Sequence, residues 1–196
     1  MSIQYSDLQL DALRELANIG SGTASTALSS MLARAVDISV PKARVLPFAE
    51  AVEATGPPEA EVTGIVLGVT GELVATVLLL VPPADAGRLV SILGVDPGDE
   101  LAASALGEIG NVVGTSYLNA LADMTGIEME PTPPATATDM LGAIVESVLA
   151  GHAVGGDVAL LLDSALEVEG EDCSVSFLLV PDQGGVDLLL SRLGLG

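Results

Sequence analysis

The sequence is poor in basic and aromatic side chains. Its 196 residues include 27 acidic but only 6 basic side chains, a formal net charge of −21, and aromatic residues make up 2 %. Nucleic acids and anionic membrane surfaces are bound through clustered lysine and arginine, so neither is an expected partner. A chain of this length suits one domain, or two small halves that share a core. That core must consist mainly of aliphatic side chains.

Cysteine and histidine are also nearly absent. Cys173 is the single cysteine and His152 the single histidine, which excludes a disulfide and argues against a protein-only zinc site. His152 stands in a glycine-rich stretch after a helical pattern, which is typical of a loop, so a catalytic Ser–His pair is not favoured. We interpret Cys173 as a small buried residue of a strand. No metal site is predicted.

No long hydrophobic run is present. The longest, Leu73 to Val81, stops at Pro82 and falls well short of the roughly 20 residues that span a bilayer. The first residues lack the basic and apolar regions of a signal peptide. We therefore expect a cytoplasmic protein. The acidic excess beside one lysine, Lys42, favours a high-salt cytoplasm, where charge repulsion is screened; an ordinary acidic protein is the alternative.

The first half of the sequence predicts a long helix followed by strands. Ser6 and Gln9 have the spacing of a capping box, and apolar residues from Leu13 to Met31 recur at helical spacing. The small residues at 20–25 would let another backbone approach closely. The later elements are a half-buried strand at 35–41, a helical turn at 47–54, a hairpin of 61–69 and 73–81, and a short helix at 84–93.

The second half repeats this order. Asp96 and Pro97 predict the start of a helix that runs to about Met124, where Gly126 ends it. Met124 is expected to be a core residue at helical spacing. The later elements are a helix from Thr138 or Asp139, strands at 158–162 and 174–180 with an acidic turn at 167–172 between them, and a helix from 182 to 193. We expect one domain built from two repeats, about 6–94 and about 99–194.

Each repeat carries a polar motif on one face of its long helix, because spacings of three and four residues bring side chains to the same face. The motif residues are Asp11, Glu15 and Asn18 in the first copy, and Ser104, Glu108 and Asn111 in the second, each 93 positions later. Both copies have a proline, Pro41 and Pro134, 23 positions past the asparagine. Solvated surface residues drift after a duplication, so this agreement favours a function.

A glutamate and an asparagine on a helix face provide no nucleophile, no cationic clamp and no metal cage. A carboxamide donates and accepts hydrogen bonds and can position a water for in-line attack, as a glutamine does in some GTPases. A carboxylate can pair with a lysine or arginine of a partner. The metal and phosphate ligands would then belong to the substrate. Such a protein would complete the active site of another protein.

The motif Asp/Ser-x-x-x-Glu-x-x-Asn, with the later proline, resembles that of the CheC/CheX/FliY phosphatases of chemotaxis. The stretches 13–28 and 135–145 are similar to the CheC type, and the resemblance spans nearly the whole chain. Two motif copies in a short chain also favour the CheC type. The resemblance implies a mixed α/β, or α+β, fold with an antiparallel sheet in a pseudo-twofold arrangement. The two motif helices would lie side by side on its outer face.

The resemblance also implies a reaction, the hydrolysis of the aspartyl phosphate of the response regulator CheY. Asn18 and Asn111 would orient the attacking water, and Glu15 and Glu108 would contact a lysine of the regulator. Mg²⁺ would be held by the regulator, and this chain would need no cofactor of its own.

The remaining motif positions have lesser roles in this interpretation. Asp11 and Ser104 would support the site, and Pro41 and Pro134 would shape the strand after each helix. The deamidase CheD is a further partner that the resemblance implies. Two alternatives stay open: an adaptor that binds CheY or CheD with little turnover, and a duplication without an active face, which would leave the motif residues buried or unclustered.

Overall fold

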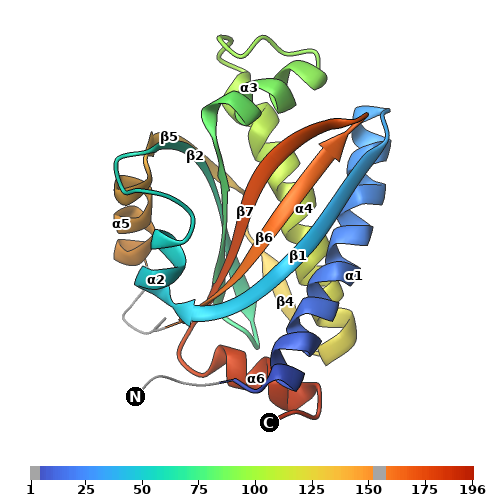
Figure 1. Cartoon of the computed structure of the whole chain (residues 1–196), viewed down its shortest axis with the longest axis vertical. Coiled ribbons are helices and arrows are strands. Elements are labelled where there is room, and N and C mark those ends of the chain that lie inside the picture. The colour runs from blue at the N-terminus through green and yellow to red at the C-terminus, as the bar shows by residue number, and fades with distance from the viewer. Residues whose placement is uncertain (1–4, 152–157) are drawn as a thin grey trace.

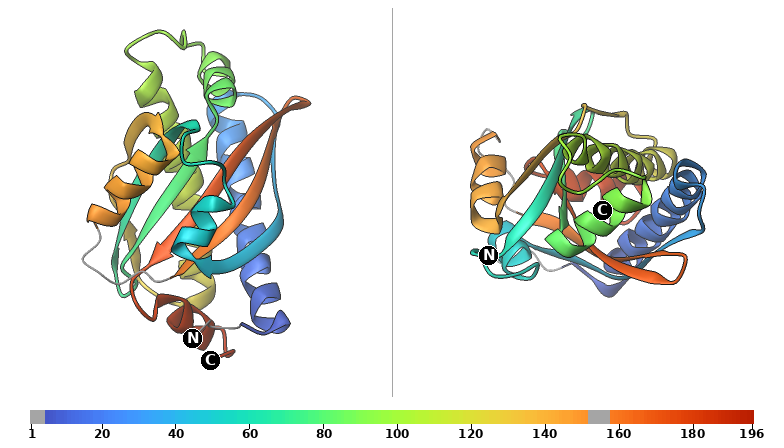
Figure 2. Two further views of the ribbon diagram at one scale, coloured as in Figure 1. Left: turned by 60° about the vertical axis from the view of Figure 1, so that its left-hand side comes forward. Right: turned by 90° about the horizontal axis from the view of Figure 1, so that it is seen from above.

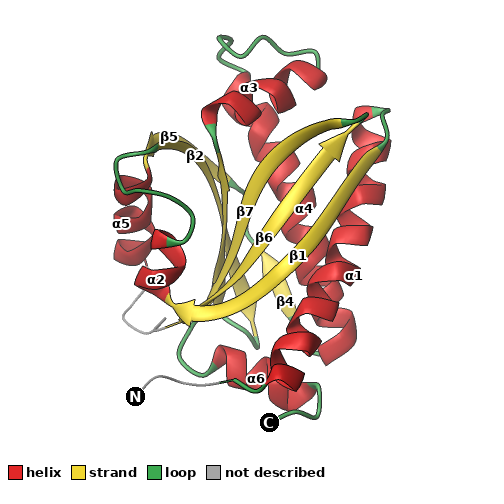
Figure 3. Cartoon of the chain, viewed as in Figure 1, coloured by secondary structure: helices red, strands yellow, loops and turns green. Residues whose placement is uncertain are grey.

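Helices cover both faces of a curled sheet (Figure 1 and Figure 3). The computed structural model describes residues 5–151 and 158–196. The first half contains α1 (Asp7–Leu32), β1 (Val36–Pro47), α2 (Phe48–Glu53), β2 (Glu61–Gly71), β3 (Ala75–Val81) and α3 (Pro83–Ile92). The second half contains α4 (Ala102–Thr125), β4 (Met129–Pro131), β5 (Ala135–Met140), α5 (Leu141–Gly151), β6 (Val158–Val168), β7 (Glu171–Pro181) and α6 (Gly185–Arg192).

The two halves share one sheet. Its strand order is β1-β6-β7-β3-β2-β4, with β5 also paired to β2, and every pair is antiparallel. The last strand of each half, β3 and β7, meet in the centre. The outer strands pair across the halves. β1 of the first half pairs with β6 of the second half, and β4 and β5 of the second half both pair with β2 of the first half. The halves are therefore interlocked and cannot be separated as two independent sheets.

The two outer ladders of the sheet have the same register. β1 shifts its register on β6 between Ser39 and Lys42, and the break between β4 and β5 falls at the equivalent place. Before the break, the pair Val36–Val168 corresponds to Met129–Gly71. After the break, the pair Lys42–Asp163 corresponds to Ala135–Val66. Pro41 lies within the first irregularity and Pro134 within the second, where a residue without an N–H is tolerated. This agreement supports two repeats.

A largely aliphatic core lies on each face of the sheet. The larger one lies under α1 and α4, with α3 and α6 at its ends, and the smaller one lies under α2 and α5. β3 is buried along its whole length, because both faces of the central sheet are covered. That explains why its sequence is apolar without alternation. The predicted α+β class and antiparallel sheet are confirmed.

α1 and α4 lie side by side on one face of the sheet (Figure 2). Their chain directions are opposite, since α1 begins near α6 and α4 begins near α3 (Figure 1). The predicted capping box of α1 is confirmed: the Ser6 backbone N–H donates to Gln9 Oε1 at 2.8 Å, and the Gln9 backbone N–H donates to Ser6 Oγ at 3.3 Å. Both helices end in a left-handed residue, Ala33 and Gly126, at equivalent positions.

Gly20 marks a very close approach between the two helices. A Cβ atom added there would lie 2.7 Å from Tyr117 Cδ1 and 3.0 Å from Tyr117 Cα. At Gly22 a Cβ atom would meet nothing within 4 Å. The predicted close approach is therefore confirmed at Gly20 and wrong at Gly22, which faces away from the helix interface.

This difference gives a stability prediction. Gly20→Ala should lower the free energy of unfolding by about 1–3 kcal/mol, because the backbone of α4 must move away. Gly22→Ala should be neutral or raise the free energy of unfolding by up to about 1 kcal/mol, because alanine favours the helix. Denaturant unfolding of the two variants measures both values. Equal effects at the two positions would contradict the packing described here.

Three predictions about the second half need correction. α4 begins at Ala102 and not at Pro97, because 96–101 forms turns in which Asp96 Oδ1 accepts a hydrogen bond from the Gly98 N–H at 2.8 Å. The helix start predicted at 138 or 139 lies in β5, an edge strand whose exposed polar residues hide the strand pattern. Met124, predicted to be core, is 42 % exposed because it points outward from the last turn of α4.

Two other expectations concern rare residues. Cys173 is buried in β7, as predicted, whereas His152 lies outside the described residues. Within 5–151 and 158–196, no cluster of three or more His, Cys, Asp or Glu is placed to hold a metal ion. No helix in the same ranges combines the length and the apolar character needed to cross a membrane.

Candidate functional site

The first motif lies on the outer face of α1. Asp11, Glu15 and Asn18 are exposed, whereas Leu13 and Leu16, between them in sequence, are buried against the sheet. The 3.6-residue period of the helix separates the two sets. The carboxylate and the carboxamide therefore point away from the core, on one side of the helix.

The second motif has the same placement on α4. Ser104 and Glu108 are exposed and Asn111 is half-buried, and no motif residue of either copy lies in the apolar core. Gly110, behind the motif, lies so close to β2 that an added Cβ would be 2.6 Å from Ile65 Cγ2. This tight seat fixes the helix, so the motif side chains project from a rigid support.

The charged residues of the two motif copies differ, but the formal charge of each motif is the same. Arg14 Nη2 lies 3.0 Å from Asp11 Oδ1, in a surface ion pair beside Glu15. In the second copy, the residues at the positions of Asp11 and Arg14 are uncharged, and only Glu108 carries a charge. Each motif therefore has a formal charge of −1, because Arg14 offsets Asp11 in the first copy. A partner would meet similar fields at both.

The two motifs lie toward opposite ends of the helix pair. Each motif occupies the N-terminal half of its helix, and α1 and α4 run in opposite directions (Figure 1). Gly20 of α1 contacts Tyr117 of α4 between them. The arrangement therefore offers two separate sites and not one combined site.

The tyrosine under the helix pair has a structural role. Tyr117 is buried between α1, α4 and the sheet, and its ring centroid lies 4.5 Å from that of Phe177. Burial raises the pKa of Tyr117, so its hydroxyl stays neutral at physiological pH. This residue stabilises the platform and does not reach the exposed motif faces.

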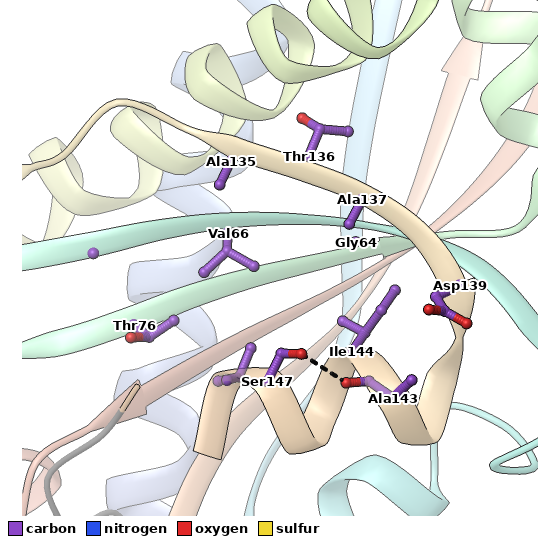
Figure 4. A pocket seen from close by; sticks show the side chains of 12 residues that line it. Gly64, Val66, Thr76, Ala135, Thr136, Ala137, Asp139, Ala143, Ile144 and Ser147 are labelled. Carbon is purple, nitrogen blue, oxygen red and sulfur yellow. Dashed lines mark hydrogen bonds between the residues drawn. The ribbon is translucent and has the colours of Figure 1, made fainter. Parts of the chain in front are cut away.

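A separate pocket lies on the other side of the sheet, between β2, β5 and α5 (Figure 4). Its volume is about 370 Å³, and small or apolar side chains form most of its wall, including Ala137 and Ile144. Among the described residues that line it, Asp139 is the one ionisable residue, and none of them is a motif residue. No pattern in the sequence indicated this pocket. The described lining residues provide no pair of groups for acid–base or hydrolytic chemistry.

Comparison with known proteins bears on the family. The family model described as "CheC-like family" matches residues 8–44 and 101–137, two stretches that start and end 93 positions apart. The CheY-P phosphatase CheC of Bacillus subtilis (strain 168) is 31 % identical over 196 residues, which cover 95 % of this chain and 94 % of that protein. The chain belongs to the CheC-like family. The predicted resemblance is confirmed.

Solved structures agree with the CheC-like fold. FliY of Thermotoga maritima superposes with a TM-score of 0.77 at 18 % identity, over 98 % of both chains. A CheX–CheY–BeF₃–Mg²⁺ complex of Borrelia burgdorferi matches with a TM-score of 0.52 at 16 % identity, over 86 % of this chain and 97 % of that one. At such identities these structures show the fold, which is the one that the sequence predicted.

Proposed function

We propose that this CheC-like protein hydrolyses the aspartyl phosphate of phosphorylated CheY. The proposal is supported by the similarity to a protein named CheY-P phosphatase CheC, and by the fold shared with a CheX solved together with CheY. The observation that carries it is the placement of both Glu/Asn pairs outside the core, on rigid helix faces, where three of the side chains are exposed and Asn111 is half-buried. The four residues are Glu15, Asn18, Glu108 and Asn111.

In this proposal each asparagine orients the attacking water. The Asn18 or Asn111 carboxamide enters the phosphorylation site of the regulator, where its oxygen accepts a hydrogen bond from the water. The water oxygen attacks phosphorus as the bond between phosphorus and the aspartate oxygen breaks. The products are inorganic phosphate and the free carboxylate of the regulator. The asparagine holds the water in line and takes no proton.

Each glutamate sets the docking geometry. Glu15 or Glu108 forms a charge-assisted hydrogen bond with the lysine beside the phosphate, which aligns the helix with the site. Mg²⁺ is held by the regulator, where it neutralises charge on the phosphoryl oxygens. Asp11 and Ser104 support the motif from the preceding turn, and Asp11 does so while paired with Arg14.

Three further expectations remain predictions. CheD is a proposed second partner, and the adaptor alternative requires that CheY or CheD binds without turnover. The cytoplasmic location stays a prediction, and the high-salt environment is proposed from composition. High salt matters for the reaction, since a chain with a net charge of −21 repels an acidic receiver domain at low ionic strength.

The lifetime of phosphorylated CheY tests this function. The phosphoryl group should be lost faster when the protein is added, and the acceleration should be larger in about 1 M than in about 0.1 M KCl, because screening reduces the repulsion. Phosphate release measures both rates. An unchanged lifetime at both salt concentrations would contradict the proposal. Binding of CheY without a shorter lifetime would favour the adaptor.

A further inference from the structure

Large apolar side chains are exposed beside both motifs. Leu8, in the first turn of α1, is 66 % exposed, and Leu101, at the N-terminus of α4, is 61 % exposed. They are the two most exposed large apolar side chains among the described residues. Isolated exposed leucines are common on protein surfaces. The positions of these two, however, are related.

The two leucines occupy equivalent positions in the repeats. They lie 93 positions apart, as the motif residues do, and each precedes its glutamate by seven residues. A spacing of seven residues is nearly two helical turns, so each leucine faces the same way as the glutamate of its helix. From Leu8 to Asn18 the helix rises by about 15 Å. Each motif face therefore has an apolar end and a polar end.

Packing within the chain does not account for these leucines. Neither belongs to the two apolar cores of the described residues or to the partly buried side chains that pack against those cores. The backbone at both places is nevertheless held in position. Ser6 and Gln9 cap the turn that carries Leu8, and the Leu101 N–H donates to Asp99 Oδ1 at 3.0 Å. Both apolar side chains thus project into solvent from an ordered helix start, ready to contact a partner.

We propose that Leu8 and Leu101 are apolar anchors for the phosphorylated receiver domain. Each leucine inserts into an apolar recess of the receiver, roughly 10–15 Å from its phosphate along the motif helix. Glu15 and Asn18, or Glu108 and Asn111, then reach the phosphate itself. This inference rests on the proposed function and extends it to the docking surface.

The charge of the protein explains why such an anchor is needed. Both motif faces are net negative, so long-range electrostatics cannot attract an acidic receiver. A contact made by burying apolar surface is not weakened when salt screens charges. The leucines therefore supply affinity at high ionic strength, where the repulsion between the two proteins is smallest. The glutamates align the motif helix with the phosphorylation site.

Variants with one remaining asparagine separate the two faces. In the Asn111→Ala background, which leaves the first face, Leu8→Ser should raise the KM for phosphorylated CheY about tenfold, with kcat changed less than twofold. In the Asn18→Ala background, Leu101→Ser should have this effect. Met140→Ser is the matched control, because Met140 is 53 % exposed on β5. It should leave KM unchanged in both backgrounds.

The outcomes decide the inference. The inference is supported if KM rises when serine replaces the leucine on the helix that keeps its asparagine. An unchanged KM, a fall in kcat alone, or an equal rise with Met140→Ser overturns it. If the wild-type protein does not shorten the lifetime of phosphorylated CheY, the proposed function fails. The anchors are then judged by binding of BeF₃-activated CheY, which Leu8→Ser with Leu101→Ser should weaken about tenfold; unchanged binding overturns them.

Discussion

The double variant Asn18→Ala/Asn111→Ala should lose on the order of 100-fold or more of its hydrolysis rate. The reason is that each carboxamide holds the attacking water in line with the breaking bond, and alanine leaves that water unoriented. Both side chains lie outside the apolar core, so folding should not change. Single-turnover phosphate release gives the rate, and binding of BeF₃-activated CheY should be largely kept.

The chain offers a chemically identical control. Asn119 is an exposed asparagine on α4, eight residues beyond Asn111. Its counterpart in the first helix is Thr26, so it does not belong to the repeated motif. Asn119→Ala should keep the wild-type rate. A loss as large as that of the double variant would contradict the role assigned to the motif asparagines.

Glu15→Gln with Glu108→Gln should raise the KM for phosphorylated CheY about tenfold, because each change removes a charge-assisted hydrogen bond to the lysine of the regulator. The carboxamide of glutamine keeps the size of the side chain but not its charge. The value of kcat should change less, since the water-orienting asparagines remain. Steady-state phosphate release, measured at several CheY concentrations, separates the two parameters.

The matched control for this pair removes the same charge elsewhere. Glu53 on α2 and Glu146 on α5 are exposed, on the opposite side of the sheet from the motif helices. Glu53→Gln with Glu146→Gln removes the same two negative charges from the chain, so it reports any effect of long-range repulsion alone. Its KM should match that of the wild type or fall slightly. A rise equal to that of the motif pair would refute a local contact.

Local sequence signals were sufficient for much of the fold. The capping box at Ser6, the helical period after it and the glycine at 126 depend on neighbouring residues, and the structure confirms them. Strand order could not be predicted in the same way. The pairing of β1 with β6 joins segments more than 100 residues apart. No local sequence pattern specifies which distant strand a given strand pairs with.

The misplaced elements have a common physical cause. β5 is an edge strand with mostly exposed residues, so it lacks the apolar alternation that identifies a half-buried strand. The start of α4 was misplaced because Asp96 and Asp99 bond to backbone N–H groups in turns, as a helix N-cap would. The repeat did not supply the missing signal either, because the strand predicted at 35–41 corresponds to 128–134, which ends before β5 begins at Ala135.

The motif faces were more predictable than the pocket and the anchors. Spacing alone places Glu15 beside Asn18 on one helix face, and the structure shows both exposed. The exposure of Leu8 and Leu101 was not predicted, because an apolar residue at the start of a helix is usually expected to be buried in the core. The equivalence of these two positions in the repeats was a usable signal.

The hydrolysis rates of the two single variants test the central claim most directly. If each motif face acts by itself on one phosphorylated regulator, Asn18→Ala and Asn111→Ala should each retain part of the wild-type single-turnover rate. The two retained rates should add up to the wild-type rate, and the double variant should lie near the uncatalysed rate. Complete loss in both single variants, or wild-type hydrolysis in the double variant, would contradict two independent water-orienting asparagines.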